Sequence, residues 1–155
     1  MKKLFATLAA VALTAVSAVA FAACGSGEKV SVKDIELTSE EYAFAIKKGN
    51  TELLDSVNSL LTEWKADGSL DELINSYFDG NATFTYTNKT SQPQEGDFVV
   101  VTDPNFPPFE LSNDNKTFNG VDIEIAYNIA QELGQTLYVK SIAFDSIIPE
   151  IQNGN

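Results

Sequence analysis

The strongest constraint on the fold is a strand–helix–strand–helix pattern in the second half of the chain. Residues 98–101 read Phe-Val-Val-Val, an uninterrupted apolar run typical of a parallel strand that is covered on both faces. A helix is predicted over residues 122–133, a second strand over residues 136–143, and a short helix capped by Asp145. Parallel strands joined through a helix form a right-handed βαβ unit. The pattern therefore predicts an α/β lobe with a mostly parallel sheet flanked by helices.

A stiff loop follows the first predicted strand. The stretch 102–110 contains three prolines within five residues. Because Pro fixes φ and has no backbone N–H, this stretch is predicted to form neither a helix nor a central strand. Residues 111–119 indicate a hairpin-like excursion before the helix, and Asp122 is the predicted cap of that helix.

One strand and one long helix are predicted in the first half of the chain. Residues 42–47 alternate large and small side chains, as a strand packed unequally on its two faces does. Asn50 is the predicted cap of a helix over residues 51–66. Apolar residues recur along this helix at the spacing of one buried stripe, which includes Trp64. A core position is therefore predicted for Trp64.

A second helix and a polar stretch follow. Ser69 and Glu72 form the pattern of a capping box, in which each side chain binds the other residue's backbone N–H. Residues 81–96 are rich in Thr, Asn, Ser and Gln, which predicts a linker. Phe84 and Tyr86 give this linker the pattern of a weak edge strand.

The first 23 residues have the composition of a secretory signal. Lys2 and Lys3 precede an apolar run over residues 4–23, and small residues stand directly before Cys24. A membrane-spanning helix is the alternative, because about 20 apolar residues are enough to cross a bilayer. The Ala-Ala-Cys end resembles a bacterial lipobox, which implies cleavage and lipid modification of Cys24.

Charge and composition argue against several functional classes. The formal net charge is −12, and it becomes −14 without the two lysines of the leader. This balance opposes nucleic-acid binding, which needs clustered cations. With no His and one Cys, neither a zinc site nor an internal disulfide is predicted, and no cofactor is expected. Asp103 and Glu110 are carboxylates of the kind used in acid–base catalysis, but no catalytic motif accompanies them, so a non-enzyme is predicted.

Several motifs in the second half occur together in one known order. They read VVVTD at 99–103, FPPFE at 106–110, NGVDIE at 119–124, AQELG at 130–134 and FDSIIP at 144–149. They closely resemble the opening of the bacterial extracellular solute-binding proteins of family 3, which serve amino-acid ABC transporters. Residues 42–50 and 66–70 resemble the closing strand and helices of the same family.

The resemblance implies one partial lobe of a type II periplasmic-binding-protein fold, with a mostly parallel sheet, one antiparallel strand and flanking helices. In the family two such lobes close around an amino acid. Here the closing piece of the first lobe precedes its opening piece, so we expect a permuted, incomplete lobe with a three-stranded sheet. Either the strand that begins at Phe98 has an unpaired edge, or the strand that begins at Tyr42 moves into the gap beside it. The implied organisation is a lipoprotein signal (1–23), a tether (24–41), a closing piece (42–80), a linker (81–96) and an opening piece (97–155).

Candidate ligand-binding residues follow from this topology. Ligands of open α/β sheets lie beyond the carboxyl ends of parallel strands, where Asp103 and Phe144 are found. By resemblance, Phe106 and Phe144 match positions that flank the ligand side chain, and Asp103 matches a position near it. Ordinary packing within the lobe is the alternative for both phenylalanines. Glu110 is a further candidate, either paired with a basic group or facing water.

The function implied by the resemblance is the substrate-binding component of an amino-acid ABC importer. Such a protein is exported, held at the outer face of the membrane by its lipid anchor, and delivers a polar amino acid to a permease. Because a single lobe cannot enclose a ligand, affinity in the millimolar range is expected. Two alternatives are a remnant that binds nothing and a lobe that associates with a partner chain through its open sheet edge.

Overall fold

The computed structural model describes residues 41–154. The chain forms two units, Met1–Tyr42 and Ala43–Asn155, and the fold described here is that of the second unit. The predicted leader, Cys24 and almost all of the tether lie outside the described residues. Within the described part of the chain, no helix combines the length and the apolar character needed to cross a bilayer.

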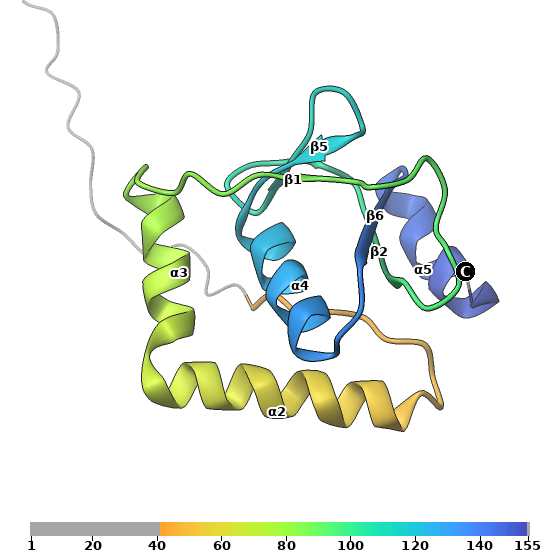
Figure 1. Ribbon diagram of the computed structural model, residues 1–155, viewed down its shortest axis with the longest axis horizontal. Helices are drawn as coiled ribbons and strands as arrows, with labels where there is room; N and C mark the ends of the chain where they lie inside the picture. The colour runs from red at the N-terminus through yellow and green to blue at the C-terminus, as the bar shows by residue number, and fades with distance from the viewer. Residues whose placement is uncertain (1–40, 155) are drawn as a thin grey trace, which may run out of the picture. The chain divides into compact units, whose positions relative to one another are not determined.

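The second unit is an α/β lobe built on one parallel strand pair (Figure 1). Strands β2 and β6 lie side by side and parallel, joined through α4, and Figure 1 shows α4 and α5 on opposite sides of this pair. The predicted α/β class and βαβ unit are therefore confirmed. In chain order the elements are α2 (Thr51–Asp67), α3 (Ser69–Phe78), β1 (Tyr86–Thr87), β2 (Phe98–Thr102), β3 (Asn105–Phe106), β4 (Glu110–Leu111), β5 (Thr117–Phe118), α4 (Val121–Glu132), β6 (Leu137–Ser141) and α5 (Phe144–Asn153).

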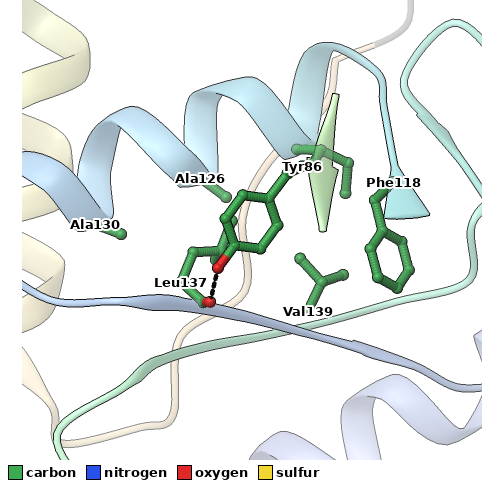
Figure 2. Close-up of a cluster of buried hydrophobic side chains, with 7 residues drawn as sticks. Tyr86, Phe118, Ala126, Ala130, Leu137 and Val139 are labelled. Atoms are coloured by element: carbon green, nitrogen blue, oxygen red, sulfur yellow. Dashed lines mark hydrogen bonds between the residues drawn. The ribbon is translucent and has the colours of Figure 1, made fainter. Parts of the chain in front are cut away.

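Side chains from the predicted linker cover the outer edge of β6. The amide group of Asn88 donates to the carbonyl oxygen of Val139 at 2.8 Å and accepts from its backbone nitrogen at 2.9 Å. The hydroxyl of Tyr86 donates to the carbonyl oxygen of Leu137 (Figure 2). The predicted edge strand is present as β1, which pairs antiparallel with β5. Residues 86–88 therefore belong to the packed lobe, which a linker prediction does not anticipate.

The outer edge of β2 is unpaired. The ladder between β2 and β6 begins and ends with two hydrogen bonds. One runs from the Phe98 nitrogen to the Thr136 oxygen, and the other from the Ile142 nitrogen to the Thr102 oxygen. In a parallel ladder the intervening residues turn their backbone groups the other way, so those of Val99 and Val101 face outward. Among the described residues, no backbone group bonds to these two positions.

The strand predicted over residues 42–47 is not formed. Described residues at these positions have irregular backbone, so the prediction was wrong and the parallel sheet has two strands rather than three. Alternating side chains indicate two unequal faces, but a strand also needs a hydrogen-bonding neighbour. Ile46 instead contributes its side chain to the hydrophobic core.

Helix α4 lies between two apolar clusters. The first cluster joins α4 to β1, β5 and β6, and the second joins the other side of α4 to α2 and α3. Trp64 packs against the second cluster, as predicted. The two pieces of the chain thus share one hydrophobic interior. Buried members of the first cluster are Tyr86, Phe118, Ile123, Ala126, Ala130, Leu137 and Val139 (Figure 2), and those of the second are Val57, Val121, Ile125 and Ile129.

The two helices of the first half begin in different ways. Oδ1 of Asn50 accepts from the Leu53 nitrogen at 3.3 Å, which confirms the predicted cap of α2. The capping box predicted at Ser69 is wrong, because Gly68 takes a left-handed conformation and Ser69 is already helical. Instead Oδ1 of Asp67 accepts from the Ser69 nitrogen at 2.9 Å, and hydrogen bonds from Ser69 lower the pKa of Asp67.

Candidate functional site

Asp103 connects the carboxyl end of β2 to the start of α5. Its Oδ2 atom accepts a hydrogen bond of 3.1 Å from the backbone nitrogen of Phe144, the first residue of α5. Its Oδ1 atom accepts from Nδ2 of Asn105 at 2.9 Å. The cap predicted at Asp145 is wrong, because no side chain of α5's own segment caps the helix. Two predicted site residues, Asp103 and Phe144, are therefore in direct contact.

Phe106 and Phe144 both present aromatic surface to solvent. Half of Phe106 and 73% of Phe144 are exposed, which argues against ordinary core packing for Phe144 in particular. Phe106 stacks on Phe109 with ring centroids 5.3 Å apart, and Phe109 meets Phe78 edge-on at 5.9 Å. Phe106 is thus one end of a row of three rings that leads from β3 to the end of α3.

Glu110 is partly buried, and one of its carboxylate oxygens is out of contact with water. It stands opposite Phe106 in the β3–β4 pair. Oγ1 of Thr102 donates to its Oε1 atom at 3.1 Å, while its Oε2 atom is buried without a hydrogen-bond partner. The neighbouring ionisable group is the carboxyl of Asp122. Among the described residues, no basic group forms an ion pair with Glu110, and only part of its side chain faces water.

Burial of these two carboxyls changes their acidity. Desolvation raises the pKa of Glu110 to about 7, and the adjacent carboxyl of Asp122 and the charge of Asp103 act in the same direction. Desolvation also raises the pKa of Asp122. A buried carboxyl beside another acid favours its protonated form, so the Glu110–Asp122 pair retains a proton to a higher pH than free side chains do.

The start of α4 is closed by backbone of the preceding loop. The predicted cap at Asp122 is wrong, because Gly120 occupies the cap position and no side chain bonds there. The backbone nitrogens of Val121 and Asp122 donate to the carbonyl oxygens of Pro108 and Phe109, each at 3.0 Å. This frees the Asp122 carboxyl to face Glu110.

The candidate site presents exposed aromatic side chains and lies apart from two cavities of the described structure. Two pockets among the described residues have volumes of about 260 Å³ and 200 Å³. Their lining includes none of Asp103, Phe106, Glu110 and Phe144. Within residues 41–154, no three acidic side chains converge closely enough to hold a metal ion. The aromatic and carboxylate groups at the ends of β2 and β6 therefore offer one wall for a ligand.

Sequence reasoning missed two contributors to this region. Thr102 is predicted only as the first residue of the stiff loop, and Asp122 mainly as a helix cap. The sequence holds a weak signal for Asp122. The hairpin-like excursion at residues 111–119 begins and ends at neighbouring positions, so it can bring Glu110, before it, close to the helix that follows it. The burial that raises the pKa of both carboxyls is not visible in the sequence.

The second half of the chain is similar to a known protein family. Residues 98–155 match the family model for bacterial extracellular solute-binding proteins, family 3. These residues carry the solute-binding family 3 pattern. The match covers the βαβ unit and the candidate site, and it agrees with the partial lobe described above.

Two curated relatives are similar to part of this chain. The probable ABC transporter arginine-binding protein ArtJ of Chlamydia trachomatis is 39% identical over 51 residues, which cover 33% of this chain and 20% of that protein. The arginine-binding periplasmic protein of Mannheimia haemolytica is 32% identical over 63 residues, which cover 41% of this chain and 25% of that protein. The matched segments thus span at most a quarter of the length of these relatives.

Proposed function

We propose that this chain supplies part of the first lobe of an amino-acid-binding component of an ABC importer. The observation that carries the proposal is the joining of Asp103 and Phe144 at the carboxyl ends of β2 and β6, within the segment that matches solute-binding family 3. Open α/β sheets hold ligands at this edge. In this proposal the protein binds a solute and catalyses no reaction.

The aromatic rings at this edge suit the side chain of an amino acid. Phe106 and Phe144 offer flat apolar surface, and Asp103 places an acceptor between the segments that carry them. Phenyl faces also attract cationic groups, particularly guanidinium. The alternative in which the open edge of β2 recruits a partner chain has no observation in its favour beyond the open edge itself.

The proposed ligand class is a cationic amino acid. Two curated relatives are named for binding arginine, and the chain itself has a formal net charge of −12. A carboxylate and two aromatic faces suit a guanidinium or ammonium group. Because one lobe leaves its ligand open to water, we expect a dissociation constant in the millimolar range, equivalent to about −4 kcal/mol.

Titration of the purified full chain with arginine, lysine, glutamine and glutamate, followed by protein NMR, tests the proposal. Arginine or lysine is expected to shift the backbone signals of Asp103, Phe106 and Phe144. Glutamate is expected to leave them unchanged. Uniform shifts across the lobe, or none with any of the four amino acids, would contradict a binding site at this edge.

Substitution separates the site from general surface effects. Phe144→Ala removes a side chain that is 73% exposed, so the fold should remain while binding weakens severalfold. Leu54→Ala, on α2, removes an exposed side chain outside the site and provides the matched control. Equal losses in both variants would assign the binding to nonspecific contact.

Export and anchoring complete the proposal. The leader and the Ala-Ala-Cys sequence before Cys24 support secretion and lipid attachment at the outer face of the membrane, from which a solute is delivered to a permease. Cys24→Ser is expected to release the exported protein from membranes. Mass spectrometry of the mature N-terminus checks this, and an unmodified cysteine would contradict the anchor.

A further inference from the structure

We propose that Glu110 and Asp122 hold one proton between them and act as a pH-sensitive clasp between the β3–β4 turn and the first turn of α4. We call this pair the carboxyl clasp. It concerns how the lobe holds the turn that carries Phe106, and it does not depend on which solute is bound.

The backbone keeps the two carboxyls together. Glu110 begins β4, and Asp122 is the second residue of α4. The Asp122 nitrogen donates to the Phe109 carbonyl oxygen at 3.0 Å, so the residue before Glu110 is fixed to the residue that faces it. Gly120 tightens the junction further, because a Cβ atom there would lie 2.1 Å from the Phe109 oxygen. The backbone segments that carry the two carboxyls therefore cannot separate without breaking these main-chain hydrogen bonds.

A shared proton explains the hydrogen bonding of Glu110. Its Oε1 atom already accepts from Thr102, but its Oε2 atom is buried and has no donor when both carboxyls are ionised. Leaving a buried charged oxygen without a partner is costly. A proton on Oε2 turns Glu110 into a donor to the Asp122 carboxylate, which satisfies both groups with one bond. The observed environment thus fits a singly protonated pair.

The surrounding charges favour retention of this proton. Asp103, after β2, and Asp122, on α4, are the charges that act on Glu110, and both are acidic. Glu124, on the same turn of α4, is bound by the hydroxyl of Tyr77 from α3 at 2.7 Å. Strand β3 consists of Asn105 and Phe106 and contributes no charge. Within residues 41–154, the charged groups that act on Glu110 include no positive one.

The direction of the pH effect follows from linkage. The pKa of Glu110 is raised to about 7 from 4.5, so the folded protein binds more protons than the unfolded chain between these values. Stability from the clasp is complete below about pH 4.5 and is lost as the pH rises through about 7. Above that pH two adjacent carboxylates repel each other, and the turn carrying Phe106 loosens from α4.

The test compares the full-length wild type with Glu110→Gln by urea unfolding between pH 5 and pH 8. Between pH 5 and pH 8, the loss of the clasp is expected to raise the unfolding constant of the wild type by about tenfold. This is less than the full pKa shift would give, because solvent screens a partly buried carboxyl. Glutamine can donate to Asp122 without ionising, so this contribution should disappear from the variant. Glu132→Gln, at the opposite end of α4, is the matched control and should keep the wild-type profile.

Two direct measurements apply to the wild type, whether or not the variant folds. Carboxyl-carbon NMR should place the Glu110 titration near pH 7, and amide exchange at Asp122, corrected for intrinsic rates, should quicken severalfold as the pH passes that value. A Glu110 midpoint near 4.5 would overturn the clasp. So would an unchanged pH profile in Glu110→Gln.

Discussion

Asp103 and Phe144 are 41 residues apart in the chain, yet Oδ2 of Asp103 accepts a 3.1 Å hydrogen bond from the backbone nitrogen of Phe144. The first free amide of α5 is therefore capped by a residue at the end of β2, rather than by its own neighbour Asp145. This contact fixes the start of α5 against the strand end. It also makes the stability of the lobe and the geometry of the candidate site depend on the same carboxylate.

Replacing Asp103 with Ala should destabilise the lobe by about 1 kcal/mol, the typical value for a lost helix cap. Asp103→Asn retains an oxygen acceptor and should cost less. Urea unfolding at pH 6 measures both changes. Asp145→Asn, in the exposed first turn of the same helix, is the control, and a loss equal to that of Asp103→Ala would show that the long-range cap has no special role.

Replacing Gly120 with Ala should disrupt the junction between the β3–β4 turn and α4. Gly120 has φ +124° and ψ 164°, a region that only glycine adopts readily, and an added Cβ would lie 2.1 Å from the Phe109 oxygen. We expect the free energy of unfolding to fall by about 3 kcal/mol or more, since backbone strain and a steric clash act together.

Gly134→Ala provides the comparison for Gly120. Gly134 has φ +68°, but nothing lies within 4 Å of its added Cβ, so only the conformational cost of about 1 kcal/mol applies. Thermal unfolding of the two variants separates strain from collision. Similar melting temperatures would mean that the turn moves aside to accommodate the Gly120 substitution.

Replacing Asn88 with Ala should open the outer edge of β6. Both backbone groups of Val139 lose their partner, and the expected loss of stability is about 2 kcal/mol, because partly buried polar groups are left unpaired. Hydrogen exchange at the Val139 amide should quicken by more than tenfold. Asn113→Ala, in an exposed turn, is the control, and equally fast exchange in both variants would contradict the role given to Asn88.

Replacing Tyr77 with Phe removes the 2.7 Å hydrogen bond to Oε2 of Glu124 and should cost about 1 kcal/mol at pH 8. Burial, together with this bond, raises the pKa of Tyr77. The wild-type advantage is therefore complete below about pH 10 and is lost as the pH rises above that value. Urea unfolding at pH 8 and pH 11 measures the difference in unfolding free energy between the wild type and Tyr77→Phe, which should be smaller at pH 11. A larger difference at pH 11 would contradict this prediction.

The regular elements were predictable where the sequence repeats with the period of the structure. The stripe of apolar residues and the Asn50 cap located α2, and the run at residues 98–101 located β2. Each of these signals lies within one segment. The parallel pairing of β2 and β6 followed from general rules of βαβ connection, whereas its residue register was not predicted.

Predictions failed where a distant segment decides the outcome. The pattern at residues 42–47 suits a strand, but no neighbouring strand bonds to it in the described structure. Polar composition at residues 81–96 indicated a linker, whereas Tyr86 and Asn88 cover the edge of β6. A polar composition shows that a segment can be exposed to water, but it does not show whether the segment covers the edge of a strand such as β6.

The candidate site was predictable in position and less so in chemistry. Strand ends located Asp103 and Phe144 at one edge because parallel strands place their carboxyl ends together. The partner of Glu110 was not predictable, because Asp122 lies beyond a hairpin whose path depends on Gly120 and the prolines of the loop. Whether these residues bind a ligand stays a prediction until the titrations are done.

The hydrogen bonds from Val121 and Asp122 to the loop carbonyls have a consequence for ligand chemistry. Exposed amides at the beginning of a helix ordinarily make a cradle for anions. At the start of α4, two of these amides are already bonded to carbonyl oxygens of the preceding loop, and the carboxyls of Glu110 and Asp122 lie beside them. In the proposed site, the carboxylate of an amino-acid ligand is therefore expected to be excluded from this corner, and the cationic end of the ligand is expected to face the lobe.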